Sequence, residues 1–510
     1  MRSAETALPG IQERPIFASE ILRAPRALVR ERLFGFARAC LLGTLFAAPL
    51  AFGAVQPWAW GAMGVAAAFL LVLWAWGEGA GKREQGTGNR EQGAGKREQD
   101  STLLMARLRS PSPSTVEGTV PEQRRREGTG VRVRVYWSPI YLPAAAFLIL
   151  VAVQYFARLT LDPAATKEAL AKLVTDLMLF FLAGQFLAQA AERQWRKMGL
   201  ALTLYAFAVG VFATLQFFSS HNQIYWAIPS PGYTFGPYVN HNHYAGLMEI
   251  LIPLAVASAL PAIRKHPSAV LLGVTALVPI ASLLLSGSRG GFIALVVEVL
   301  LAAVLIFLGG PRRARKAAAS VGGLAIIAAV LLFFWMAPRQ TAERLATMAD
   351  ATHSPEVALA DRLAPAKDSL RIFRDHPWLG AGLGSFETVF PRYQSFPSDL
   401  VWDHAHNDYA EALAETGIVG GALILFSLGL FFRLAFTNLR ERLWHRVGWL
   451  QIGAAVGCCG LLVHSFIDFN LHIPANAAWF AVCAAIATCV PKGTMGRWRF
   501  AGDGPDPGGL

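Results

Sequence analysis

Arginine, histidine and asparagine side chains gather in short stretches that border long apolar runs. One stretch, Ser286-Gly-Ser-Arg-Gly-Gly291, contains Arg289. An arginine offers a planar fork of donors that matches a phosphate, and the adjoining glycines let a ligand approach the backbone closely. The stretch therefore predicts a phosphate-binding site. A snorkelling arginine that anchors a helix end explains the position of Arg289 equally well.

A second stretch, Trp402-Asp-His-Ala-His-Asn-Asp408, supplies candidate bases. A histidine can take a proton from a hydroxyl near neutral pH. Residues two apart in an extended segment face opposite sides, so we expect only one of His404 and His406 to point into a site. Two surface histidines are the competing interpretation. A third is a zinc centre, for which the spacing is weak evidence, made of His241, His243, His404 and His406.

Two further stretches add polar groups. Asn240, Asn242 and His243 stand where an apolar run begins. Asparagine is a natural helix N-cap, but capping accounts for one residue and not for the whole Asn-His-Asn-His run. Tyr233 in the same loop can stack on a sugar ring or simply fill a turn. Asp468 follows a later apolar run and brings a carboxylate to its end.

The composition shows what must position these residues. The chain has 510 residues, of which 54% are apolar and only 16% are charged, and its mean hydropathy is +0.40. A usual soluble domain has about 25% charged residues. These values exclude a disordered chain, a disulfide-stapled secreted domain and an ordinary cytosolic enzyme. The net charge of +12 is expected from basic cytoplasmic loops rather than from nucleic-acid binding.

Twelve apolar windows are long enough to cross a bilayer core of about 30 Å as helices. The sequence thus predicts an all-α polytopic membrane protein of about 12 transmembrane helices. Asp176 makes the fourth window the weakest. The windows are 36–55, 57–76, 138–157, 169–189, 199–218, 243–262, 268–287, 291–309, 317–337, 417–436, 447–466 and 471–490.

Lys and Arg concentrate in the short loops that share a side with the N-terminus. The positive-inside rule then places both termini in the cytoplasm, and all four polar stretches at the outer face. The predicted parts are an N-terminal segment with two helices (1–76), a cytoplasmic insertion (77–137), helices three to nine (138–337), an outer loop domain (338–416), helices ten to twelve (417–490) and a cytoplasmic tail (491–510).

The two long loops differ in character. Residues 77–137 carry a degenerate repeat, GKREQGT, GNREQGA and GKREQDS, which lacks apolar heptad positions and is Gly-rich and polar. This predicts a disordered tether, with nucleic-acid binding as the weaker alternative. Residues 338–416 contain a helical pattern, glycine turns and several aromatic residues. Loops of this length are commonly functional or disordered, and the aromatic residues favour a folded outer element.

Four motifs in order resemble those of the O-antigen ligase and O-antigen polymerase superfamily. LLLSGSRGGFIAL (283–295) resembles its Ser-Arg-Gly motif, and TFGPYVNHNHYAGLMEILIPLA (234–255) its Asn-His-Ala-Gly segment. DRLAPAKDSLRIFRDHPWLGAGLGSFE (361–387) is similar to the start of the family's large periplasmic loop, and HAHNDYAEALAETGIVGG (404–421) to its end. The resemblance covers about 200–490.

The resemblance implies a membrane glycosyltransferase of the GT-C type in the bacterial inner membrane. Such an enzyme transfers a glycan from an undecaprenyl-diphosphate carrier to an acceptor hydroxyl at the periplasmic face, without a metal, nucleotide or other cofactor. We expect an O-antigen ligase whose acceptor is lipid A-core or similar. A polysaccharide polymerase or a protein O-oligosaccharyltransferase of the same superfamily is the alternative. An alternative outside this superfamily is a lipid-linked glycan flippase, for which inverted repeats and broken mid-membrane helices are expected. A further alternative is a non-catalytic scaffold protein.

By the same resemblance, Arg289 matches the arginine that holds the diphosphate and His406 the catalytic base. Many family members have another arginine shortly before Gly-Thr-Phe, whereas the corresponding stretch here, 229–234, has none. We expect the second diphosphate contact from Arg362, Arg371 or Arg374 of the large loop. The alternative is that the donor differs from the family's usual one. The residues expected to bind substrate are Arg362, Arg371, Arg374, Asn407, His404, Tyr233, Asn240, Asn242, His243 and Asp468.

Overall fold

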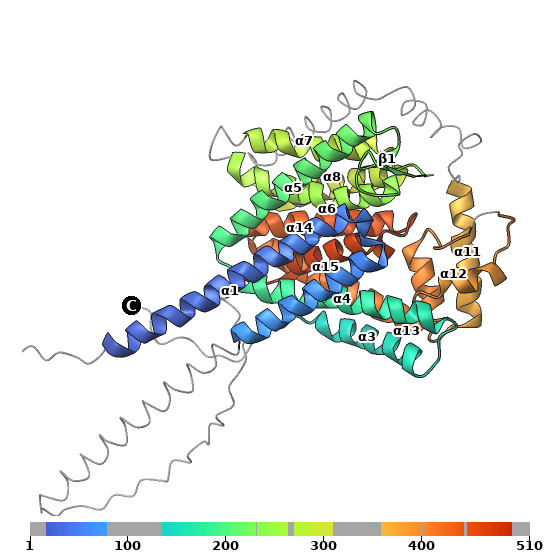
Figure 1. Cartoon of the computed structure of the whole chain (residues 1–510), viewed down its shortest axis with the longest axis horizontal. Coiled ribbons are helices and arrows are strands. Elements are labelled where there is room, and N and C mark those ends of the chain that lie inside the picture. The colour runs from blue at the N-terminus through green and yellow to red at the C-terminus, as the bar shows by residue number, and fades with distance from the viewer. Residues whose placement is uncertain are drawn as a thin grey trace, which may run out of the picture. The chain divides into compact units, whose positions relative to one another are not determined.

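The computed structural model describes residues 17–78, 135–230, 232–263, 270–309, 359–398, 401–442 and 446–491. These residues are almost wholly helical (Figure 1). The helices are α1 (Phe17–Leu50), η1 (Phe52–Ala54), an unlabelled helix (Pro57–Glu78), α3 (Tyr141–Phe156), α4 (Pro163–Ala188), α5 (Glu192–Ser219), α6 (His241–Ile263), α7 (Val270–Leu285), α8 (Arg289–Gly309), α11 (Leu359–Asp375), α12 (Phe386–Val389), η3 (Phe390–Arg392), α13 (Asp408–Arg442), α14 (Arg446–His464), η4 (Asn470–His472) and α15 (Pro474–Thr488). Strands β1 (Gln223–Ile224) and β2 (Ile228–Pro229) form one short antiparallel hairpin.

Helices occupy eleven of the twelve apolar windows, and the remaining one, 317–337, lies outside the described residues. Seven of the described helices are long and apolar enough to cross a membrane, and three shorter apolar helices accompany them. The protein is therefore an all-helical integral membrane protein. Twelve spans and their orientation remain a prediction.

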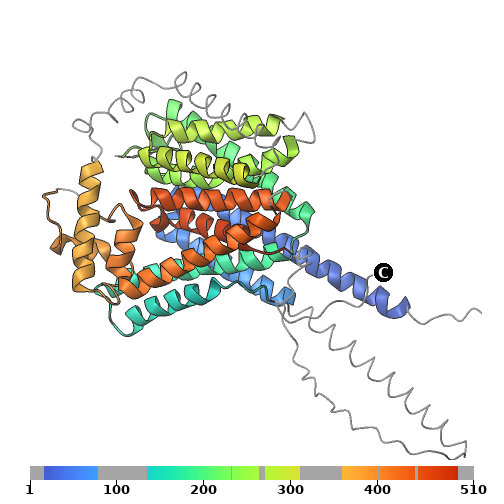
Figure 2. The same cartoon turned by 180° about the vertical axis from the view of Figure 1, so that it is seen from behind.

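The chain forms two compact units. The first comprises Met1–Ala39 with Leu70–Val135, and in it Arg30 forms an ion pair with Glu78 at 2.6 Å. The second comprises Cys40–Phe69 with Tyr136–Leu510 and contains all residues of the candidate site. Within it, α14 and α15 lie in the middle, with α6, α7 and α8 on one side and α3 and α4 on the other (Figures 1 and 2).

Helices α6 and α14 approach each other closely because α14 presents glycine at the contact. A Cβ on Gly453 would lie 2.6 Å from the Pro253 carbonyl oxygen. A Cβ on Gly457 would lie 3.0 Å from the Ile250 Cα atom. Small residues four apart allow this kind of helix contact inside a membrane, where burial of apolar area does not drive association. The close approach brings polar side chains of both helices within reach of one another.

The segment after α11 folds onto a break in α13. Gly417 has φ +64° and interrupts the helix, and the amide of Ile418 donates to the Pro377 carbonyl at 2.8 Å. The amides of Ala381 and Gly382 donate to the carbonyls at 414 and 415, both at 2.9 Å. A side chain at Gly417 would collide with the Trp378 backbone, 2.4 Å away. The break thus coincides with the predicted start of the tenth span.

An aromatic cluster holds the described part of the large loop together. Phe386 and Phe390 stack with ring centroids 4.7 Å apart, and Trp402 meets Phe396 edge-on at 5.4 Å. The buried members of the cluster are Ile372, Ala381, Phe386, Val389, Phe390, Trp402, Ala405 and Ala414. The predicted folded element is present in the described residues, while its outer location remains a prediction. The proposed tether lies outside the described residues, apart from its first two and last three positions.

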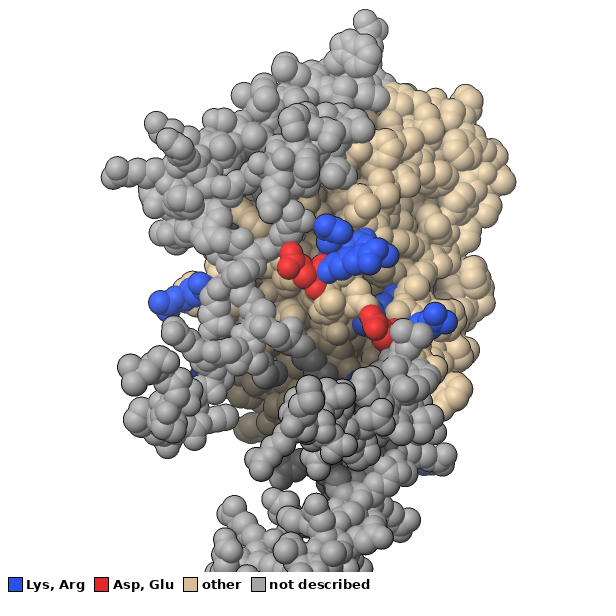
Figure 3. Space-filling model, turned by 90° about the vertical axis from the view of Figure 1, so that its left-hand side faces the viewer, with Lys and Arg blue, Asp and Glu red and all other residues tan. Residues whose placement is uncertain are grey.

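Charged side chains occupy little of the surface that Figure 3 shows, where a basic patch has acidic side chains beside it. At the start of α5, Arg193, Arg196 and Lys197 are exposed. Such a cluster next to an apolar helix is typical of a cytoplasmic loop.

Candidate functional site

Arg289 is the first residue of α8. Gly287, with φ +71°, makes the turn from α7, and the Ser288 hydroxyl accepts the Gly291 amide at 3.1 Å as an N-cap. The positive end of the α8 dipole therefore lies beside the guanidinium, an arrangement that favours an anion. Arg289 is half-buried, and no described residue forms a hydrogen bond or ion pair with it. Its donors are directed to no protein acceptor in this part of the chain.

The turn before α8 packs against the start of α6. A Cβ on Gly291 would lie 2.7 Å from the Ala245 Cβ, and one on Gly287 would lie 4.0 Å from the Tyr233 hydroxyl. The loop before α6 therefore borders the Arg289 turn. In that loop the Asn240 side chain accepts the Asn242 amide at 2.9 Å, so Asn240 has the predicted capping role.

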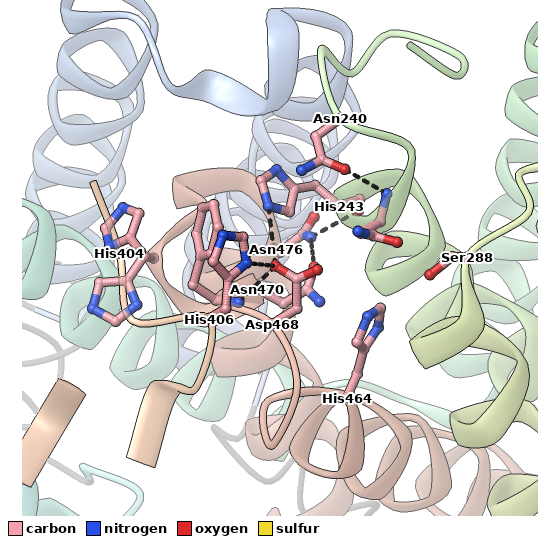
Figure 4. Close-up of polar contacts among 12 residues, drawn as sticks. Asn240, His243, Ser288, His404, His406, His464, Asp468, Asn470 and Asn476 are labelled. Carbon is pink, nitrogen blue, oxygen red and sulfur yellow. Dashed lines mark hydrogen bonds and ion pairs between the residues drawn. The ribbon is translucent and has the colours of Figure 1, made fainter. Parts of the chain in front are cut away.

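His406 and His243 meet at one buried carboxylate. His406 Nδ1 lies 3.6 Å from Asp468 Oδ1, and His243 Nε2 lies 3.7 Å from the same oxygen. Asp468 is fully buried, and both imidazole rings contact Phe469 edge-on. Figure 4 shows the two histidines, carried by separate segments, directed at Asp468. The backbone of His406 is left-handed, with φ +49°.

With Nδ1 of His406 facing Asp468, its Nε2 is the atom left for a substrate. A carboxylate beside one imidazole nitrogen orients the ring and stabilises the cation that forms when the other nitrogen takes a proton. The distance of 3.6 Å is longer than a hydrogen bond, and catalytic contacts of this kind tighten in the substrate complex. His406 is 18% exposed at its side chain, so a ligand can reach it.

His404 belongs to a neighbouring network rather than to this pair. Its Nδ1 lies 2.7 Å from Glu411 Oε1, and the other Glu411 oxygen accepts the Ala405 amide at 2.7 Å. His472 approaches the same Glu411 oxygen as His404, with Nε2 at 3.2 Å, and its Nδ1 lies 2.7 Å from Asp408. Burial lowers the pKa of His472, but the carboxylates of Glu411 and Asp408 outweigh burial and raise the pKa to about 10.

His404, Glu411 and His472 are also the described residues whose donor atoms could share a metal ion. Two imidazoles and a carboxylate are a set that zinc accepts. The distances between them are those of hydrogen bonds and ion pairs, so the three side chains satisfy one another as they stand. The predicted alternative set, His241, His243, His404 and His406, is split, because His241 Nδ1 faces the Tyr233 carbonyl at 3.3 Å.

The remaining predicted residues have other surroundings. Asn407 caps α13 by accepting the amides of Tyr409 and Ala410, and it donates to the Phe466 carbonyl at 2.9 Å. Arg371 lies 3.4 Å from Asp368 on the same helix, and Arg374 is exposed in the last turn of α11. Among the described residues, no hydrogen bond or ion pair joins either of these arginines to the Arg289 turn. The side chain of Arg362 lies outside the described part.

The segment 464–468 connects the two halves of the site. Gly290, next to Arg289, packs on His464, since a Cβ there would lie 2.3 Å from Nε2. Asp468, four residues further on, faces His406. Arg289, at the start of α8, and His406, in the loop before α13, therefore both lie close to the C-terminal end of α14. The sequence did not indicate that His464 pairs with Glu249. The only sign of the pair in the sequence was a glutamate inside one apolar window and a histidine near the end of another.

We compared the chain with known protein families. Residues 274–425 match the family model "O-Antigen ligase". The predicted resemblance to the O-antigen ligase and polymerase superfamily is thereby confirmed. The O-antigen ligase segment contains Arg289, α11 and the stretch 404–411, whereas His243 and Asp468 lie outside it. No curated protein matches the chain.

Proposed function

We propose that this protein is an O-antigen ligase-type glycosyltransferase of the bacterial inner membrane. It transfers a glycan from an undecaprenyl-diphosphate carrier to an acceptor hydroxyl, on lipid A-core or a similar glycolipid, at the periplasmic face. The observation that carries the proposal is that His406 faces the buried Asp468 close to the start of α8, where Arg289 has no partner among the described residues. Both proposed catalytic residues lie inside the O-antigen ligase segment.

The reaction needs a base and a charge stabiliser on opposite sides of one sugar carbon. His406 Nε2 takes the proton of the acceptor hydroxyl while that oxygen attacks the anomeric carbon. The bond from this carbon to the diphosphate oxygen breaks, and the lipid diphosphate leaves with the bonding electrons. Arg289 and the start of α8 stabilise the negative charge that develops on it. A single displacement of this kind inverts the anomeric configuration.

The neighbouring polar residues would line the glycan site. Tyr233 borders the Arg289 turn and His243 faces the Asp468 carboxylate, while Asn242 is the buried residue that precedes His243. Asn240 and Asn407 shape this region as helix caps. His404 contributes through Glu411, as a residue that positions the loop. Arg371 and Arg374 are exposed, so they would contact substrate only at the edge of the glycan site.

No metal is assigned a role, because the proton and the leaving-group charge are handled by side chains. Activity in purified membranes should therefore survive EDTA. Strong inhibition that zinc reverses would instead assign a metal to His404, Glu411 and His472.

The proposal is tested by deleting the gene and analysing envelope glycolipids, polysaccharides and glycoproteins by mass spectrometry. We expect uncapped acceptor glycolipid and accumulated lipid-linked glycan, with restoration by the wild type and not by Arg289→Ala at equal membrane abundance. Loss of long polysaccharide with the acceptor still bearing one repeat unit would indicate a polymerase. Glycoproteins that lose their glycans would indicate a protein O-oligosaccharyltransferase. Donor accumulation confined to the cytoplasmic leaflet would indicate a flippase.

A further inference from the structure

A buried histidine–carboxylate pair lies directly beside the Arg289 turn. His464 ends α14, and its Nδ1 lies 2.7 Å from Glu249 Oε1 of α6. The two side chains are 1% and 0% exposed. Figure 4 shows the His464 ring pointing from the end of α14 toward the side on which Ser288 and Asp468 lie.

The other edge of the His464 ring faces α8. A Cβ on Gly290 would lie 2.3 Å from Nε2 and 2.4 Å from Cδ2, so the ring touches the backbone at the position after Arg289. Only glycine leaves room for an imidazole there. Because Nδ1 is directed at the Glu249 side chain, the Nε2 edge is turned toward the Arg289 turn.

Two ionisable groups buried within apolar helices are costly, and such residues mark functional sites by default. A contact between α6 and α14 alone does not require them, since the close approach at Gly453 and Gly457 already joins these helices. A second buried carboxylic side chain, Glu298 of α8, lies against Gly460 and forms no hydrogen bond with described residues. Glu298 is buried to a similar degree as Glu249, and no hydrogen bond or ion pair joins it to His464 among the described residues.

A diphosphate that links a sugar to a lipid carries two negative charges. The single guanidinium of Arg289 neutralises one of them, and the other phosphate oxygens need hydrogen-bond donors when they leave water. A second donor is therefore expected close to Arg289. His464 is the buried imidazole that touches the adjoining residue, and its Nε2 edge can supply that donor while Nδ1 contacts Glu249.

We propose that His464, positioned by Glu249, is the second contact for the diphosphate of the lipid donor. Arg289 and His464 Nε2–H bind the diphosphate from adjacent sides, and Glu249 orients the imidazole through Nδ1. This inference rests on the proposed function, and it assigns to α6 and α14 a part of the donor site that lies outside the O-antigen ligase segment.

The test measures binding of undecaprenyl diphosphate and undecaprenyl monophosphate to the purified full-length protein in detergent. We expect the wild type to prefer the diphosphate. His464→Gln should weaken diphosphate binding about tenfold or more, since a hydrogen bond to a charged group is lost, and should change monophosphate binding little. Glu249→Gln should act in the same direction, and Glu298→Gln should leave the preference unchanged.

Thermal unfolding identifies variants that fail to fold. If His464→Gln does not fold, the inference is tested by the diphosphate preference of Glu249→Gln, with Glu298→Gln as its control. Unchanged preference in a folded His464→Gln or Glu249→Gln variant overturns the inference. If the inference is overturned but Arg289→Ala still reduces diphosphate binding, the proposed function stands without a role for His464. If the wild type shows no preference and Arg289→Ala has no effect, the proposed function itself fails.

Discussion

The substitution Gly290→Ala adds one methyl group beside His464 and removes no functional group, so it can shift the proposed donor site without changing its chemistry. The Cβ of Gly290→Ala would lie 2.3 Å from His464 Nε2, whereas ordinary van der Waals contact begins at 3.4 Å. The imidazole or the start of α8 must therefore move by about 1 Å. Overpacking of this kind costs about 1–3 kcal/mol of folding free energy. A displacement of about 1 Å at a reacting group can reduce a rate about a hundredfold.

The matched control is Gly429→Ala on α13, where a Cβ would meet no atom within 4 Å. Replacing glycine by alanine in a helix interior stabilises the helix by roughly 0.5–1 kcal/mol. Thermal unfolding of both purified variants, followed by tryptophan fluorescence, should show Gly290→Ala below the wild type and Gly429→Ala at or above it. Glycan transfer should be lost only in Gly290→Ala. Equal stability and equal transfer in the two variants would refute the close packing of His464 on the Arg289 turn.

Three further predictions concern the histidines and the insertion. His406→Ala should reduce transfer more than His404→Ala, because His406 faces Asp468 while His404 is held by Glu411; the reverse order in a membrane transfer assay would reassign the base. The carboxylates that raise the pKa of His472 to about 10 stabilise the folded protein fully below the unfolded value of about 6.5, and this contribution disappears as pH rises through about 10. Unfolding temperatures measured from pH 7 to 10 should therefore fall more steeply for the wild type than for His472→Gln, and parallel curves would contradict the assignment. Deletion of 82–99 should leave transfer largely intact, whereas an inactive but membrane-inserted deletion variant would show that the insertion does more than connect two helices.

The sequence predicted the helices well because apolar windows of the required length have few other stable structures in a membrane. It placed the start of the tenth span at 417, where Gly417 breaks α13. Hydropathy does not show that residues 408–416 are also helical before the break, whereas the resemblance at 404–421, in which a His-Asn pair precedes a helix ending in Glu-Thr-Gly, does. That helix depends on the Asn407 cap and on the amides of Ala381 and Gly382, which reach it from a distant part of the chain.

Candidate site residues were easier to find than their partners. Arg289 and His406 stand out in the sequence because their neighbours carry recognisable motifs. The pairing of His406 with Asp468 and of His464 with Glu249 depends on how α6, α8 and α14 pack. Hydropathy gives the existence of these helices but not which faces meet. Both pairings therefore emerged only from the three-dimensional arrangement.

The central claim is that Arg289 and His406 act on one lipid-linked diphosphate sugar. A photoreactive undecaprenyl-diphosphate sugar analogue, with its reactive group on the sugar, tests this most directly when the labelled peptides of the full-length protein are identified by mass spectrometry. We predict that adducts form on both 286–291 and 404–411 and decline together in Arg289→Ala. Adducts on neither segment, or on one segment with no dependence on Arg289, would contradict the account.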